Sequence, residues 1–163
     1  MSNSTKKINN SGEVLAWSMY DFANQPFTNL VLTFIYGTFF TTVIASNEIV
    51  GTQQWSHAIS ITAIVVALLS PFMGALADKG GYRKMFMFFF TWLTIIATTV
   101  LYFVLPGQVI RALFWFVLAN IGFEMGSVFC NAYLPDISHS KNIGRISGYG
   151  WSLGYVGGLL SLA

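Results

Sequence analysis

Five long apolar stretches, separated by short polar segments, follow one another along the chain. They cover about residues 17–45, 58–77, 85–105, 109–133 and 146–163. Each of the first four reaches or exceeds the roughly 20 residues that cross a lipid hydrocarbon core as a helix. Helix is the required form, because open strands would leave backbone groups unpaired in lipid. The pattern therefore predicts an all-α membrane protein with about five transmembrane helices.

The polar segments divide the chain into an N-terminal tail and a helical bundle. Residues 1–13 are polar and are expected to form a flexible cytoplasmic tail, whereas residues 14–163 form an incomplete N-terminal helical bundle. The connections between the apolar stretches are too short to hold a second domain. The last stretch is still apolar at Ala163, and multi-span proteins rarely end inside a span. We therefore expect the chain to be a fragment of a longer protein.

Charge is sparse, and its placement predicts the orientation in the membrane. Only 9% of the residues are charged, against about 25% in soluble domains, and the net charge of +2 gives no reason to expect a nucleic-acid partner. With the N-terminus inside, seven of the eight basic residues face the cytoplasm and Arg111 alone lies outside. Such a bias predicts an integral protein of a cell's inner or plasma membrane with a cytoplasmic N-terminus.

Polar side chains recur inside two of the predicted spans. They lie on one face of the first helix and on one face of the fourth, and the candidates for a solute and proton pathway are Asp21, Gln25, Asn29, Asn120, Glu124 and Asn131. A charge at the centre of a membrane helix costs about 2.5–3.5 kcal/mol, so these positions indicate function. The alternative is that they only join helices through hydrogen bonds worth about 0.6 kcal/mol each.

The fifth apolar stretch carries glycines four residues apart. Gly150, Gly154 and Gly158 would form a smooth helix face that permits close approach of a neighbouring helix. Small-residue faces are common in membranes. This one predicts a tight helix contact and says little about function.

The loop between the second and third stretches carries a recognisable motif. Residues 74–84 read Gly-Ala-Leu-Ala-Asp-Lys-Gly-Gly-Tyr-Arg-Lys, which resembles the signature loop of the major facilitator superfamily, although Tyr82 stands where a basic residue is usual. Glycine permits a tight turn, and an aspartate at a helix end can pair with a basic residue. The resemblance implies a gating loop made of Gly74, Asp78, Gly81, Arg83 and Lys84, with Asp136 and Arg145 as acidic and basic partners in the next inner loop. The alternative is ordinary anchoring of the loop by positive charge.

The flanking segments narrow the resemblance. Trp17–Asn24, Asn131–Asp136 and Ser147–Gly158 are similar to the vacuolar amino-acid effluxer-like (autophagy-related effluxer-like) branch of that superfamily, over about residues 14–163. The resemblance implies the N-terminal part of a twelve-helix major facilitator fold. In that fold the first and fourth helices line a cavity between two six-helix halves.

The resemblance implies a secondary active transporter that moves a small organic solute by alternating access, with amino acids as the first candidate solute. A proton gradient is the expected driving force. Glu124 and Asp21 are the candidate coupling acids, because a carboxyl group away from water is less readily ionised. The expected partners are the solute, the lipid bilayer and the missing C-terminal helices of the full-length carrier.

Two other classes of protein fit the sequence less well. An enzyme is not expected, because the chain has no HExxH or GxSxG motif, and His57 and His139 fall on opposite sides of the membrane. No cofactor and no metal site are expected either. The remaining alternative is a small multi-span membrane protein with a structural or assembly role.

Overall fold

The structure is a computed structural model that describes residues 11–163. The described residues form helices and contain no strand: α1 (Ser11–Pro26), η1 (Phe27–Phe34), α2 (Tyr36–Phe39), η2 (Phe40–Ile44), α3 (Glu48–Gly80), α4 (Arg83–Leu101), α5 (Val109–Asn131), α6 (Leu134–Ile137) and α7 (Ile143–Leu160). Most of the tail expected over residues 1–13 lies outside the described residues, and its last three residues belong to the start of α1.

The first span is one long apolar element that alternates between α-helix and π-helix, with two π-helical segments. Both η1 and η2 are π-helical, with wide turns such as the bond from Ile35 N–H to Leu30 O. The change begins directly after Pro26, whose nitrogen cannot donate a backbone hydrogen bond. Short π-helical segments are frequent at functional sites. The π-helical turns therefore make the part of the first span that directly follows α1 a candidate functional region.

Helix α3 is longer than the second apolar stretch. Asn47 caps it, since its side-chain Oδ1 accepts a hydrogen bond from Val50 N–H at 2.9 Å, and the helix therefore begins at Glu48. At the other end Gly81 has a left-handed conformation with φ 67°, and its N–H donates to Ala77 O. Glycine adopts this conformation without the strain that a side chain would bring, so the chain can turn directly into α4.

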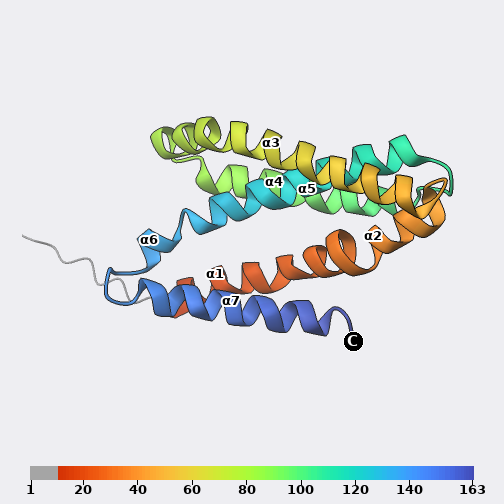
Figure 1. The fold of residues 1–163 in the computed structure, drawn as a ribbon. Coiled ribbons are helices and arrows are strands. Elements are labelled where there is room, and N and C mark those ends of the chain that lie inside the picture. Colours follow the sequence, from red (N-terminus) through yellow and green to blue (C-terminus); the bar gives the residue numbers. More distant parts are fainter. Residues whose placement is uncertain (1–10) are drawn as a thin grey trace, which may run out of the picture.

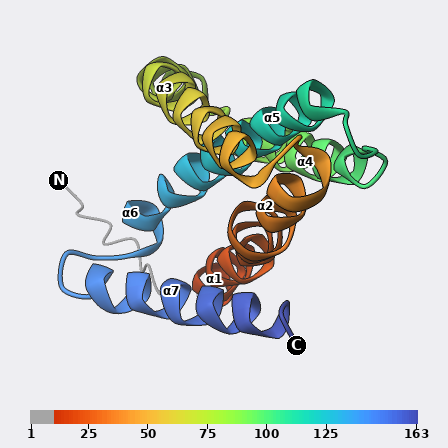
Figure 2. The ribbon, with the colours of Figure 1, turned by 45° about the vertical axis from the view of Figure 1, so that its right-hand side comes forward.

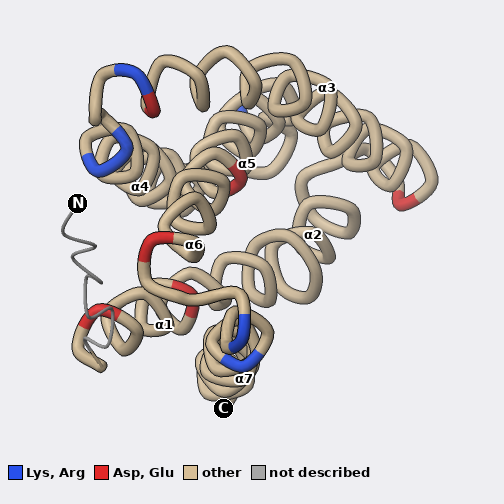
Figure 3. The backbone as a smooth tube through the Cα atoms, turned by 90° about the vertical axis from the view of Figure 1, so that its left-hand side faces the viewer, with Lys and Arg blue, Asp and Glu red and all other residues tan. Residues whose placement is uncertain are grey.

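The long helices assemble into two groups. Helices α3, α4 and α5 pack together, and α1 lies beside α7 (Figure 1). Turning the molecule shows the first span crossing from α7 toward α3 and α5 (Figure 2). Lys and Arg residues lie where α3 meets α4 and at the start of α7 (Figure 3). These two regions belong to the end of the bundle that the charge pattern assigns to the cytoplasm.

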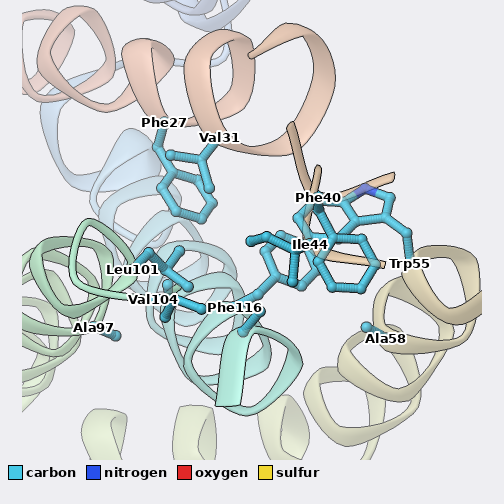
Figure 4. Close-up of a cluster of buried hydrophobic side chains, with 12 residues drawn as sticks. Phe27, Val31, Phe40, Ile44, Trp55, Ala58, Ala97, Leu101, Val104 and Phe116 are labelled. Atoms are coloured by element: carbon cyan, nitrogen blue, oxygen red, sulfur yellow. The ribbon is translucent and has the colours of Figure 1, made fainter. Parts of the chain in front are cut away.

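An apolar cluster holds the first span against α3, α4 and α5 at the opposite end. Trp55 stacks on Phe116 with ring centroids 3.8 Å apart, and the Phe40 ring lies 5.2 Å from Trp55 (Figure 4). Phe40 and Phe116 are fully buried. Their burial joins the far end of the first span to the α3–α5 group.

Four helical segments are long and apolar enough to cross a membrane: Ser11–Ile44, Glu48–Gly80, Arg83–Leu101 and Val109–Ile137. They correspond to the first four apolar stretches. Helix α7 has 18 residues, but it is not among these four, because its six glycines lower its mean hydropathy. On α4, Phe88 and Phe89 are exposed while Phe90 and Thr94 are buried against α5. Only one face of α4 is therefore available to lipid.

Candidate functional site

The polar face of the first span lies against the glycine face of α7. A Cβ atom built on Gly154 would lie 2.6 Å from Asp21 Oδ2, and one on Gly158 would lie 2.6 Å from Asn29 Nδ2. Gln25, between them, would be 3.1 Å from the Gly154 Cβ. The glycines thus provide the space that the Asp21, Gln25 and Asn29 side chains occupy.

A pocket of about 310 Å³ opens next to this contact. The first span supplies Gln25, Thr28 and Asn29, and α5 supplies Phe123. On the other side α7 contributes Trp151, Gly154, Tyr155 and Gly158. Phe123 is held in place by stacking on Phe27, with the ring centroids 5.0 Å apart. Amide and hydroxyl groups therefore face aromatic rings across a space of ligand size.

The polar residues of α5 occupy different environments. Asn120 is buried, and its Oδ1 has no hydrogen-bond partner among the described residues. Glu124 is half-buried and directly follows Phe123 of the pocket wall, whereas Asn131 is exposed. Asn120 and Phe123, three residues apart, share a helix face. Of the six pathway candidates, the structure brings Gln25 and Asn29 together in the pocket and leaves Asp21, Asn120, Glu124 and Asn131 outside its lining.

Two further α1 side chains connect this helix to the α3–α5 group. The Trp17 Nε1–H donates to Cys130 O at 2.9 Å, and the hydroxyls of Tyr20 and Thr91 lie 2.9 Å apart. We did not single out either α1 residue from the sequence. The available signal was that both are amphipathic aromatic residues within about one turn of Asp21.

An ion-pair cluster joins the end of α3, the start of α4 and α6; Figure 3 colours the acidic and basic residues of these elements. The Arg83 guanidinium donates to Asp78 Oδ1 at 2.7 Å and to Asp136 Oδ2 at 2.8 Å. It also donates to Ala132 O, 3.3 Å away at the end of α5, where carbonyl groups carry partial negative charge. Arg83 at the start of α4 is therefore bound to the end of α3 and to the segment after α5.

The other residues of the predicted gating loop have separate positions. Gly81 forms the turn, whereas Gly74 lies within α3, where an added Cβ atom would meet open space. Lys84 is exposed and forms no ion pair within residues 11–163. Arg145, expected as the basic partner that the next inner loop supplies, lies on α7, where it lines a second pocket beside α1. Asp136 pairs with Arg83 because α6 follows directly after the end of α5, next to the start of α4.

Comparison with known proteins decides the family. A sequence model of the family described as vacuole effluxer Atg22 like matches residues 55–163, which is more than half of the chain. The chain belongs to this family. The Atg22-like match extends from α3 through α7 and includes both the ion-pair cluster and the α7 side of the pocket. The all-helical fold agrees with the N-terminal part of a major facilitator superfamily transporter.

Individual relatives of this Atg22-like chain support the assignment. A Bacillus subtilis (strain 168) protein described as an uncharacterized MFS-type transporter, YxiO, is 29% identical over 87% of the chain and 34% of its own length. An uncharacterized protein of Aquifex aeolicus (strain VF5) is 33% identical over 91% of the chain and 36% of its own length. Autophagy-related protein 22 of Coccidioides immitis (strain RS) is 32% identical over 48% of the chain and 13% of its own length.

The chain thus spans about a third of the length of the first two of these relatives. No solved structure matches it.

Proposed function

We propose that this Atg22-like chain supplies solute-contacting helices of a secondary active transporter. The solute is a small polar organic molecule, with amino acids as the first class to test. Transport proceeds by alternating access and is driven by a proton gradient. The protein lies in a cell's inner or plasma membrane with its N-terminus in the cytoplasm.

The pocket between the first span, α5 and α7 is the observation that carries the proposal. Gln25, Thr28 and Asn29 offer hydrogen-bond donors and acceptors, and Phe123, Trp151 and Tyr155 offer apolar contact. Polar groups at membrane depth are costly, and they are retained where they contact a solute or water. A volume of about 310 Å³ suits a molecule of amino-acid size.

The Arg83 cluster suits a gate on the cytoplasmic side. It consists of three charged side chains on separate segments, all at least partly exposed, so water can replace its contacts when the segments separate. A gate must open as well as close, and a fully buried ion pair would be far more costly to break. The cluster therefore supports alternating access without requiring a large energy input.

Uptake into proteoliposomes by the native-length protein tests the proposal. A panel of radiolabelled amino acids is offered with and without an imposed pH gradient, and saturable uptake accelerated by the gradient is expected for at least one of them. Absence of saturable uptake across the panel would contradict the choice of solute class.

Replacing Glu124 tests whether this residue couples proton movement to solute transport. Glu124→Gln cannot release a proton, so we expect normal expression and loss of the acceleration by the pH gradient. Glu48→Gln, which changes an exposed acid at the start of α3, is the matched control and should retain the acceleration. Gradient-driven uptake that is unchanged in Glu124→Gln would remove this residue from the mechanism.

A further inference from the structure

A second pocket, of about 440 Å³, lies where α1 and α7 begin. Its apolar wall comes from both helices and includes Val14, Leu15, Ile146 and Leu153. Leu15 is 57% exposed, so an apolar surface lies open at this end of the helix pair. In a chain whose helices cross a membrane, this open apolar wall faces the region where lipid chains begin.

Two polar side chains and the first turn of α7 at this pocket have donors without a partner among residues 11–163. Ser18 is 1% exposed, and its Oγ has no hydrogen-bond partner among the described residues. Arg145 lines the same pocket and forms no ion pair within residues 11–163. In the first turn of α7, the N–H groups of Gly144 and Arg145 meet no acceptor in the described part of the chain. The exposed donors of Arg145 and of the first turn of α7 thus lie beside an apolar pocket, and the buried Ser18 lies in its lining.

These donors suit a phosphate group. A guanidinium binds a phosphate through two parallel hydrogen bonds, and N–H groups at a helix N-terminus favour an anion. Lys141, two residues before α7, adds positive charge at the same end. The apolar wall distinguishes a lipid phosphate from a free anion, because a free anion would gain nothing from Val14 or Leu153.

We propose that this pocket binds the headgroup of an anionic phospholipid. Arg145 and the first turn of α7 hold the phosphate, and the first carbons of an acyl chain lie on Val14, Leu15 and Leu153. Basic pockets between membrane helices are known to bind anionic headgroups. The proposal depends on the helices spanning a membrane and is independent of solute transport.

Measuring lipid binding by the purified full-length protein tests the proposal of a phospholipid site. Native mass spectrometry in detergent measures retained phosphatidylglycerol and phosphatidylcholine of identical acyl chains. Phosphatidylglycerol should bind more tightly to the wild type. Arg145→Gln should weaken its binding about tenfold, which corresponds to about 1.4 kcal/mol. Lys79→Gln, which removes an exposed cation at the same end of the bundle but outside the pocket, should not.

A second variant and a competitor complete the test. Ser152→Trp places a bulky ring in the pocket from an exposed position, so it should reduce phosphatidylglycerol retention without disturbing the helix. An excess of inorganic phosphate should leave the lipid bound. The proposal is overturned if Arg145→Gln binds phosphatidylglycerol like the wild type, if Lys79→Gln weakens that binding as much as Arg145→Gln, or if Ser152→Trp has no effect. It is also overturned if the wild type binds phosphatidylcholine as tightly as phosphatidylglycerol, or if phosphate displaces the lipid.

Discussion

A single arginine links three segments at one end of the bundle. Arg83 contacts Asp78, Asp136 and the carbonyl of Ala132, and its side chain is 29% exposed while each carboxylate is 59% exposed. Exposed ion pairs contribute about 0–1 kcal/mol each. The main effect of Arg83 is therefore on the relative position of α3, α4 and α6, and its effect on folding stability is small.

Arg83→Gln separates these two effects. The substitution removes both ion pairs, so we expect it to lower the free energy of unfolding by only about 1 kcal/mol. If the cluster holds the cytoplasmic side closed, a loss of this size changes the closed population several-fold and lowers the uptake rate accordingly. Thermal unfolding in detergent and proteoliposome uptake measure the two quantities. Lys79→Gln is the control, and unchanged uptake by Arg83→Gln would contradict a gating role.

At the scale of elements, the contact between α1 and α7 is closely fitted. Gly157 approaches the backbone carbonyl of Phe22, and Gly150 approaches the Trp17 ring. A backbone carbonyl cannot rotate away as a flexible side chain can. The position of α7, and with it one wall of the pocket, therefore depends on the absence of a side chain at Gly157.

Gly157→Ala is expected to disrupt this pair. The added methyl would collide with the Phe22 carbonyl, and overpacking of this kind costs about 1–3 kcal/mol. Gly148→Ala on the same helix is the matched control, because a Cβ there meets nothing within 4 Å and the change should be neutral or slightly stabilising. The unfolding temperatures of the two variants in detergent measure this difference. Equal temperatures would show that α7 does not pack against α1 at Gly157.

The sequence predicted the elements better than their partners. Hydropathy alone placed the first four spans, because a membrane helix must be apolar over a fixed length. The glycines of α7 predicted a tight contact but gave no information on which helix makes it. The π-helical turns after Pro26 also escaped prediction, since a proline in an apolar run predicts a local irregularity and not its form.

The candidate site was predicted in part for a similar reason. Helical spacing placed Gln25 and Asn29 on one face, and both line the pocket. Spacing along one helix cannot say which residues of another helix lie opposite, so Phe123 and Tyr155 went unnoticed. The partner of Asp136 likewise depends on the path of the chain after α5, which brings Asp136 to Arg83.

For the whole molecule, the central claim is that polar side chains of the first span face water and solute. The first span, α5 and α7 line the pocket, with Gln25 and Asn29 from the first span and Phe123 from α5. If these side chains only joined helices, the pocket would be dry. Access of water to positions 25 and 29 therefore distinguishes a pathway from a structural contact.

Thiol labelling in the native-length protein measures that access most directly. Cysteines replace Gln25, Asn29, Asn120 and Glu124 one at a time in a background where the buried Cys130 is changed to Ala, and Phe88→Cys on the exposed face of α4 is the lipid-facing control. A membrane-impermeant thiol reagent should modify Gln25→Cys and Asn29→Cys, more slowly when solute is present, and should leave Phe88→Cys unmodified. If all four pathway positions stay as unreactive as Phe88→Cys, the polar face does not line a pathway.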